Sequence, residues 1–159
     1  MTFTDNCTHY TRLDILRTKD EAFTAYKTFS SWAKTQHSIT IKHLCSDCSS
    51  EFTSNEFMAY LKQQGMEHRL TMHNMPQHNG IAESLNCCLL ECVQAILHQA
   101  DLPKNLWAEA LQFAVWLKNQ TSTKALGTIM PYSNFTGRSP ISQSCWNGAN
   151  LYGCITRQA

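Results

Sequence analysis

The sequence lacks any run of about eighteen apolar residues, so it predicts no membrane-spanning helix. Its first residues, Met1 to Asp5, lack the basic and apolar regions of a secretory signal, and no other targeting signal is seen. We therefore expect an intracellular, reducing environment, in which a scaffold of disulfides is not maintained. The eight cysteines of the chain need another explanation.

Positive charge is also scarce. Thirteen Lys and Arg stand against twelve Asp and Glu, the formal net charge is +1, and no segment carries a Lys/Arg cluster. A protein that grips DNA through its phosphates is expected to carry a basic face. The composition is therefore evidence against strong DNA binding.

The cysteines include one pattern that resembles a zinc site. The candidate ligands are His43, Cys45 and Cys48, which contain a C-x-x-C step, and Cys87, Cys88 and Cys92 on a later segment. A structural zinc site needs four ligands at regular spacing, and no second C-x-x-C or H-x-x-x-H pair is present. We therefore do not expect zinc.

The length and composition suit one domain with a sizeable core, because 43% of the 159 residues are apolar and the aromatics are spread along the chain. We place this domain at residues 1–140. Beyond Thr121, Gly, Ser, Asn and Pro predict loop, and residues 141–159 are interpreted as a C-terminal loop or tail.

Hydrophobic periodicity predicts an alternation of strands and helices. The expected order is strands at 1–5 and 10–16, a helix at 18–35, a strand at 38–45, a helix from 53 to about 65, a strand at 67–71, and helices at 80–100 and 104–120. Capping boxes at Thr18–Glu21 and Thr53–Glu56 mark two helix starts, and Asn79 can cap a third.

Two acidic residues are candidate metal ligands. Asp47 follows the strand at 38–45, and Glu83 lies in the expected first turn of the helix at 80–100, with thirty-five residues (48–82) between them. Carboxylates held by two rigid elements can bind a divalent metal for phosphodiester chemistry. Two acids at a given spacing are a weak signal alone, because solvated surface acids are common.

The surrounding residues are more specific. The segments are Ser46-Asp47, Pro76-Gln-His-Asn-Gly-Ile-Ala-Glu83 and Trp107-Ala-Glu-Ala110. Together they resemble the integrase core of copia-type LTR retrotransposons, in which the second and third acids of an Asp-Asp-Glu metal triad are also thirty-five residues apart. The resemblance runs from about Phe3 to about Pro140.

The resemblance implies an α/β, ribonuclease-H-like integrase core, a mixed sheet with flanking helices. In that family the fold begins one strand earlier, with a central strand that carries the first acid in a His-x-Asp-x-x-Gly-Pro motif. No such motif occurs here, so we expect the first, central strand to be missing and the domain to be truncated at its N-terminus. Asp5 aligns with an acid at the end of the second strand and does not replace the missing one.

The implied function is DNA integration: metal-dependent processing of 3′ ends and strand transfer by hydroxyl attack on a phosphodiester. Asp47 and Glu83 would be two of three catalytic ligands for Mg²⁺ or Mn²⁺. Gln77 and Asn79 would contact DNA, while Glu51 would shape its loop. The implied partners are element ends and target DNA, a homo-oligomer is possible, and the nucleus is the expected location.

The missing motif leaves it open whether this chain is an enzyme, and we expect it to be inactive. The alternative is a non-catalytic nucleic-acid-binding or interaction module derived from the same element. It predicts DNA affinity with a salt dependence and no metal requirement. A basic patch in three dimensions would favour it, whereas the charge count argues against it.

We hypothesise that this chain comes from a mutationally decayed copy of the element, which would account for several departures from the family. Where relatives commonly carry basic or polar residues, this chain carries cysteines. Two glycines that the family carries in the loop after Asp47 are replaced here by Ser49 and Ser50. Transitions at C and G nucleotides produce such changes. The positions concerned include Cys45, Cys87, Cys88, Cys92, Gln94 and Gln120. The hypothesis is that the cysteines are remnants of a basic DNA-binding face. Serine would strain the loop if its backbone required positive φ.

Overall fold

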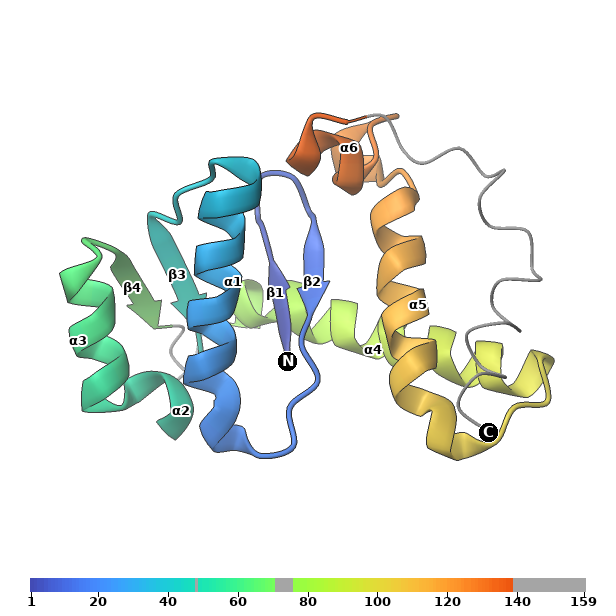
Figure 1. Ribbon diagram of the computed structural model, residues 1–159. Coiled ribbons are helices and arrows are strands. Elements are labelled where there is room, and N and C mark those ends of the chain that lie inside the picture. The colour runs from blue at the N-terminus through green and yellow to red at the C-terminus, as the bar shows by residue number, and fades with distance from the viewer. Residues whose placement is uncertain (48, 71–75, 139–159) are drawn as a thin grey trace.

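The computed structural model of the chain describes residues 1–47, 49–70 and 76–138 (Figure 1). Its strands are β1 (Thr2–Thr4), β2 (Thr11–Leu13), β3 (His43–Ser46) and β4 (Glu67–Leu70). Its α-helices are α1 (Ala22–His37), α2 (Ser50–Thr53), α3 (Asn55–Gln63), α4 (Pro76–Gln99), α5 (Trp107–Gln120) and α6 (Pro131–Thr136). Short 3-10 turns lie at Lys19–Glu21, Lys104–Leu106 and Lys124–Leu126.

The strands form two separate pairs in the described part of the chain. β1 and β2 are antiparallel, with Phe3 opposite Arg12, and β3 and β4 are parallel, with Leu44 opposite His68. Both strand directions of the predicted mixed sheet are therefore present. In the described residues the two pairs are not joined to each other.

One aromatic core nevertheless spans both pairs. Phe3 of β1, Tyr26 of α1 and Phe57 of α3 are buried in one cluster, and Leu44 of β3 packs against it. Figure 1 shows α1 crossing the view between the two strand pairs. Each such side chain contributes about 1.5–3 kcal/mol when it leaves water. The two strand pairs are thus held together by side-chain packing on α1 and α3.

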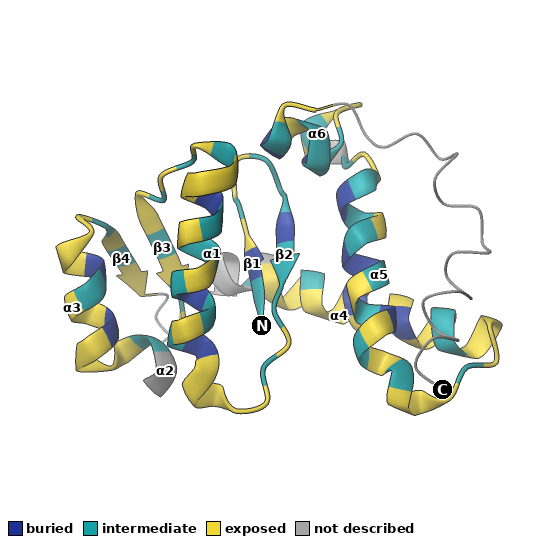
Figure 2. Cartoon of the chain, in the orientation of Figure 1, coloured by how far each residue is buried: buried dark blue, intermediate teal, exposed yellow. Residues whose placement is uncertain are grey.

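A second core joins the two longest helices. Leu89 and Val93 of α4 pack against Ala110 and Ala114 of α5, and Leu13 of β2 packs against the same cluster. The residues of this cluster recur at helical spacing, as the sequence predicts for α4. Most other described side chains of α4 are exposed (Figure 2). Among them is Ala82, which was expected on the buried stripe.

Several predicted helix starts are wrong by a few residues. Thr18 makes no side-chain capping bond, and the Glu21 carboxylate accepts from the Arg17 N–H instead. The cap of α3 is Ser54, whose Oγ accepts from the Phe57 N–H at 3.3 Å, and not Thr53. Ser54 lies three residues before Phe57, which is wholly buried.

α4 differs most from its prediction. It begins at Pro76, so Asn79 lies inside the helix and does not cap it. Proline suits the first position of a helix, because its ring fixes φ and no N–H is left unpaired. The predicted polar loop is therefore helical from Pro76 onward.

Two further segments depart from the sequence reading. α6 forms where loop was predicted, starting at Pro131 and ending before Gly137, which has φ +67°. The strand predicted over 38–45 is confined to β3. The predicted tail at 141–159 lies outside the described residues, and the domain boundary near 140 stays a prediction.

None of the helices found in the described ranges is both long enough and apolar enough to cross a membrane.

Candidate functional site

Asp47 lies at the carboxyl end of the parallel strand pair. β3 ends at Ser46, and Asp47 is the next residue, with an exposed side chain. Its Oδ1 accepts a hydrogen bond from the Ser49 N–H at 3.2 Å. Open α/β sheets present their sites at the carboxyl ends of parallel strands. The carboxylate is therefore oriented by its own turn at a position suited to a ligand.

The turn after Asp47 is not strained by the serines that stand where glycines were expected. Ser49 has φ −66° and ψ 153°, which is extended backbone that any residue adopts, and Ser50 begins α2. Neither position needs a positive φ. The condition under which serine would strain this loop is therefore not met.

Glu83 lies on α4 with an exposed side chain. Because α4 begins at Pro76, Glu83 falls in the second turn of the helix and not in the first as expected. The next helical residue after β4 is Pro76, only six Cα–Cα steps beyond Leu70, which limits their separation to about 20 Å. Leu70 is opposite Ser46 in the parallel pair. Chain connectivity therefore limits how far the start of α4 can lie from the carboxyl end of β3.

A hydrogen-bonded chain lies beneath Asp47. The Ser46 hydroxyl donates to the Asp47 carbonyl at 3.0 Å, and the same Oγ lies 2.8 Å from Nε2 of His68. The other ring nitrogen of His68 lies 3.1 Å from Sδ of Met58 on α3. Burial lowers the pKa of His68 below its usual value. Near neutral pH the ring is therefore uncharged and carries one proton.

The opposite face of the same strand pair is charged and exposed. His43 Nδ1 lies 2.7 Å from a Glu67 carboxylate oxygen, and Arg69 donates to that oxygen at 3.0 Å. The Arg69 guanidinium holds the pKa of Glu67 below its usual value. Cys45 is opposite Arg69 on this face. This ionic group is separate from the Ser46 and His68 side chains, because alternate residues of a strand point to opposite faces.

Other predicted residues lie elsewhere or outside the described side chains. The Asp5 side chain hydrogen-bonds within the β1–β2 turn. Its Oδ2 accepts from the Thr8 N–H at 3.0 Å and from the Thr8 hydroxyl at 2.6 Å. Figure 1 shows that turn and the carboxyl end of β3 at opposite ends of the strands. The side chains of Gln77, Asn79 and Glu51 are outside the described part, and their predicted roles stay predictions.

The donor atoms of the site match a hard divalent cation in kind. Asp47 and Glu83 offer carboxylate oxygens, which Mg²⁺ and Mn²⁺ prefer. The number of donor residues is too small for a complete site. Residues 1–47, 49–70 and 76–138 bring together no group of three or more His, Cys, Asp or Glu able to hold an ion. The zinc candidates do not converge there either: Cys45, Cys87, Cys88 and Cys92 are free and exposed, and Cys48 lies outside the described residues.

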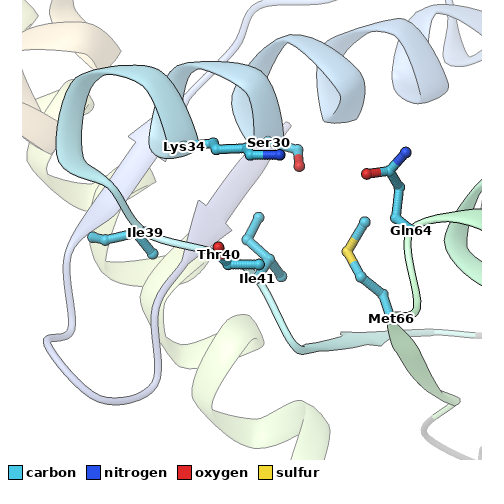
Figure 3. Close-up of a pocket in the computed structure, with 7 residues that line it drawn as sticks. All are labelled: Ser30, Lys34, Ile39, Thr40, Ile41, Gln64 and Met66. Atoms are coloured by element: carbon cyan, nitrogen blue, oxygen red, sulfur yellow. The ribbon is translucent and has the colours of Figure 1, made fainter.

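The small cavity in Figure 3 is a separate feature. It has a volume of about 30 Å³ and is lined by Ser30 and Lys34 of α1, Ile39 to Ile41 before β3, and Gln64 and Met66 after α3. It therefore lies at the amino end of β3, whereas Asp47 lies at the carboxyl end. Its size suits a water molecule or two and not a nucleotide.

The sequence reading missed Ser46 and His68 as partners. Both belong to segments that were predicted as strands or strand ends. Whether their side chains come into contact depends on the register between β3 and β4. With Leu44 opposite His68 and Ser46 opposite Leu70, Ser46 and His68 are diagonal neighbours on one face. No local pattern reveals that register, so no sequence signal identified the pair.

No family model matches the chain. It is 32% identical over 154 residues to the retrovirus-related Pol polyprotein from transposon TNT 1-94 of Nicotiana tabacum. It is 30% identical over 152 residues to the Pol polyprotein from transposon RE2 of Arabidopsis thaliana. These matches cover 97% and 96% of the chain but only 11% and 10% of the polyproteins.

Solved structures share the fold. The catalytic core domain of HTLV-2 integrase, in complex with magnesium, matches with a TM-score of 0.62 and 17% identity over 83% of this chain and 80% of that one. The catalytic core domain of BIV integrase matches with the same TM-score and identity over 84% and 82%. At this identity the likeness concerns the fold alone.

Proposed function

The chain is homologous to the Pol polyproteins of retrovirus-related transposons and has the fold of a retroviral integrase catalytic core, and on this basis we propose that it serves DNA integration as an integrase core. It spans about a tenth of the length of those polyproteins, so the proposal concerns one part of a larger activity.

One observation carries the proposal. Asp47 leaves the carboxyl end of a parallel strand pair, and the neighbouring strand β4 leads within a few residues to the helix that carries Glu83. This order of elements supports a site in which carboxylates from two rigid elements face the same end of the strand pair. Among the described acids, this pair combines exposure with a position beyond the strand ends.

We assign Asp47 and Glu83 as ligands of Mg²⁺ or Mn²⁺. When bound, such an ion polarises the phosphate and stabilises the charge that develops on oxygen. Asp47 is prepared for this role by its own turn, because the Ser49 N–H fixes one of its carboxylate oxygens. Gln77 and Asn79, at the start of α4, are assigned to contact the DNA.

The reaction proposed for the complete site is transesterification at phosphorus. A DNA 3′-hydroxyl oxygen, or a water oxygen during end processing, bonds to the phosphorus, and the bond from phosphorus to the 3′ oxygen of the attacked strand breaks. The attacking group gives up its proton to solvent and the leaving oxygen takes one up. No oxidant or other reactant is needed.

We further propose that these 159 residues do not catalyse the reaction alone. Two-metal chemistry needs a full ligand set, and the described residues bring together no group of three possible ligands. The break between the β1–β2 and β3–β4 pairs supports this, because a strand that joined them would run beside β3.

The test is Mg²⁺- or Mn²⁺-dependent strand transfer on a short DNA end. We would compare this chain with one extended by the segment that precedes the matched region in the tobacco polyprotein. The extended chain should be active, and Asp47→Asn or Glu83→Gln should abolish its activity. Glu56→Gln, an exposed acid on α3, is the matched control. Activity that survives both substitutions would overturn the assignment, and folded but inactive extended protein would overturn the proposed function.

A further inference from the structure

The hydrogen bonds under Asp47 connect it to a residue that is not adjacent in sequence. Ser46 Oγ lies 3.0 Å from the Asp47 carbonyl oxygen and 2.8 Å from His68 Nε2. His68 is anchored in turn by Met58 of α3, whose sulfur lies 3.1 Å from Nδ1, and its ring lies 6.0 Å from that of Phe57. The chain runs from the partly exposed Met58, next to the wholly buried Phe57, to the exposed aspartate.

The proton positions in this chain are constrained. A serine hydroxyl has one proton to donate, and Ser46 directs it to the Asp47 carbonyl. With the proton placed there, the same oxygen accepts from His68, and the ring proton lies on Nε2. In the opposite tautomer, Ser46 would donate its proton to Nε2. The Nδ1–H group would then donate to the Met58 sulfur, which is a weak acceptor. The Nε2–H form keeps two hydrogen bonds to oxygen and is favoured.

We propose that His68 is a positioning residue for Asp47, acting through Ser46. The inference rests on the proposed function only for its consequence, the orientation of a metal ligand. The Nε2–H group orients the Ser46 hydroxyl, and the hydroxyl holds the carbonyl of Asp47. The Ser49 N–H then holds the carboxylate from the other side. Asp47 is thus held at its main chain and at its side chain.

The location of His68 supports this role over a purely structural one. It is half-buried, and its nitrogens lie within hydrogen-bonding distance of Ser46 and Met58 and not of the ionic group on the opposite face. That face provides the matched control, because His43 also bonds across β3 and β4 but to Glu67. Partners that hold a metal ligand in place typically change metal affinity by about 10–100-fold when removed.

The first measurement is ¹⁵N NMR of the His68 ring in this chain at pH 7.5. We expect the Nε2–H tautomer. The Nδ1–H tautomer would overturn the proposal, because Ser46 would then donate to the ring and could not hold Asp47. This result does not depend on metal or DNA.

The second measurement uses the backbone carbonyl ¹³C shift of Asp47. Ser46→Ala and His68→Phe should move it to the same degree, the double variant should add nothing, and His68→Gln should restore it through its amide N–H. His43→Gln should leave it unchanged. A shift unmoved by His68→Phe, or moved equally by His43→Gln, would contradict the proposal.

Mn²⁺ affinity, followed by electron paramagnetic resonance, separates this inference from the proposed function. His68→Phe should weaken binding about tenfold, and His68→Gln should recover it. If Asp47→Asn leaves Mn²⁺ binding intact, the metal assignment fails, while the tautomer and carbonyl shifts still decide the role of His68.

Discussion

The side-chain amide of Asn119 pairs with the main chain of Thr11 as a neighbouring strand would. The Thr11 N–H donates to Asn119 Oδ1 at 2.9 Å, and Asn119 Nδ2 donates to the Thr11 carbonyl at 2.6 Å. Both residues are buried, with 5% and 0% of their surfaces exposed. α5 thereby satisfies the outer main-chain groups of β2, which a two-stranded pair leaves open.

Asn119→Leu should therefore destabilise the protein strongly. It removes both bonds and leaves a buried N–H and a buried carbonyl unpaired, at a cost of about 1–3 kcal/mol each. Urea unfolding should show a free energy of unfolding lower by about 2–4 kcal/mol. Asn134→Leu, at an exposed position of α6, is the control and should change it by less than about 0.5 kcal/mol. Equal effects of the two substitutions would mean that the pairing contributes nothing.

The neighbouring Lys118 predicts a pH dependence. Its amine donates to the His9 carbonyl and to Thr11 Oγ1, and burial lowers its pKa from 10.5 to about 8. Between pH 8 and 10.5 the unfolded chain binds a proton that the folded chain does not, so this residue makes stability rise with pH in that window. Below pH 8 its destabilising effect is fully present.

The comparison is between wild type and Lys118→Met, because cysteines and tyrosines titrate in the same range and cancel in the difference. The free energy of unfolding of the wild type should increase relative to the variant from pH 8 to pH 10. Parallel curves would show that the amine is not perturbed by folding.

Phe57 anchors the aromatic core and should be the most sensitive position of α3. Its side chain is wholly buried against Tyr26, Phe23 and Phe52. Phe57→Ala should lower the free energy of unfolding by about 3–5 kcal/mol. Leu90 is 56% exposed on α4, and Leu90→Ala should change stability by about 0.5 kcal/mol at most. A comparable loss at Leu90 would show that an unseen surface covers it.

The cap of α3 distinguishes the structure from the sequence reading. Ser54→Ala removes the acceptor for the Phe57 N–H and should cost about 1 kcal/mol. Thr53→Ala, at the position that the capping-box pattern indicated, should cost less. Thermal unfolding of the two variants gives the order directly, and the reverse order would favour the sequence reading.

Ser38 offers a stabilising substitution. It ends α1 with φ +56°, a conformation that favours glycine. Ser38→Gly should raise the free energy of unfolding by up to about 1 kcal/mol. Ser31→Gly, inside the same helix, should lower it by about 0.5–1 kcal/mol. The opposite signs are the test, and two losses would contradict the backbone argument.

The sequence predicted the elements that carry the site, and it did so for physical reasons. The buried stripe of α4 through Leu89 and Val93 repeats at helical spacing, and Gly65, at φ +68°, ends the α3 region as expected. For these elements, the local sequence was enough to predict the structure. The local sequence was also enough to predict that Asp47 follows a strand.

The remainder depended on contacts between distant segments. Ile39 and Ile41 alternate as a strand should, yet β3 starts at His43 because its partner β4 is only four residues long. The Ser46–His68 contact follows from the register of those two strands. α6 is different: Pro131 and Gly137 are start and stop signals that the loop-like composition around them concealed.

The break between the two strand pairs has a consequence for handling the molecule. Each described strand has a neighbour on one side only, so β1 and β3 each present a row of main-chain donors and acceptors that no other described strand occupies. Such edges are templates for pairing with other chains. Concentrating the isolated chain should thus promote self-association through these strand edges.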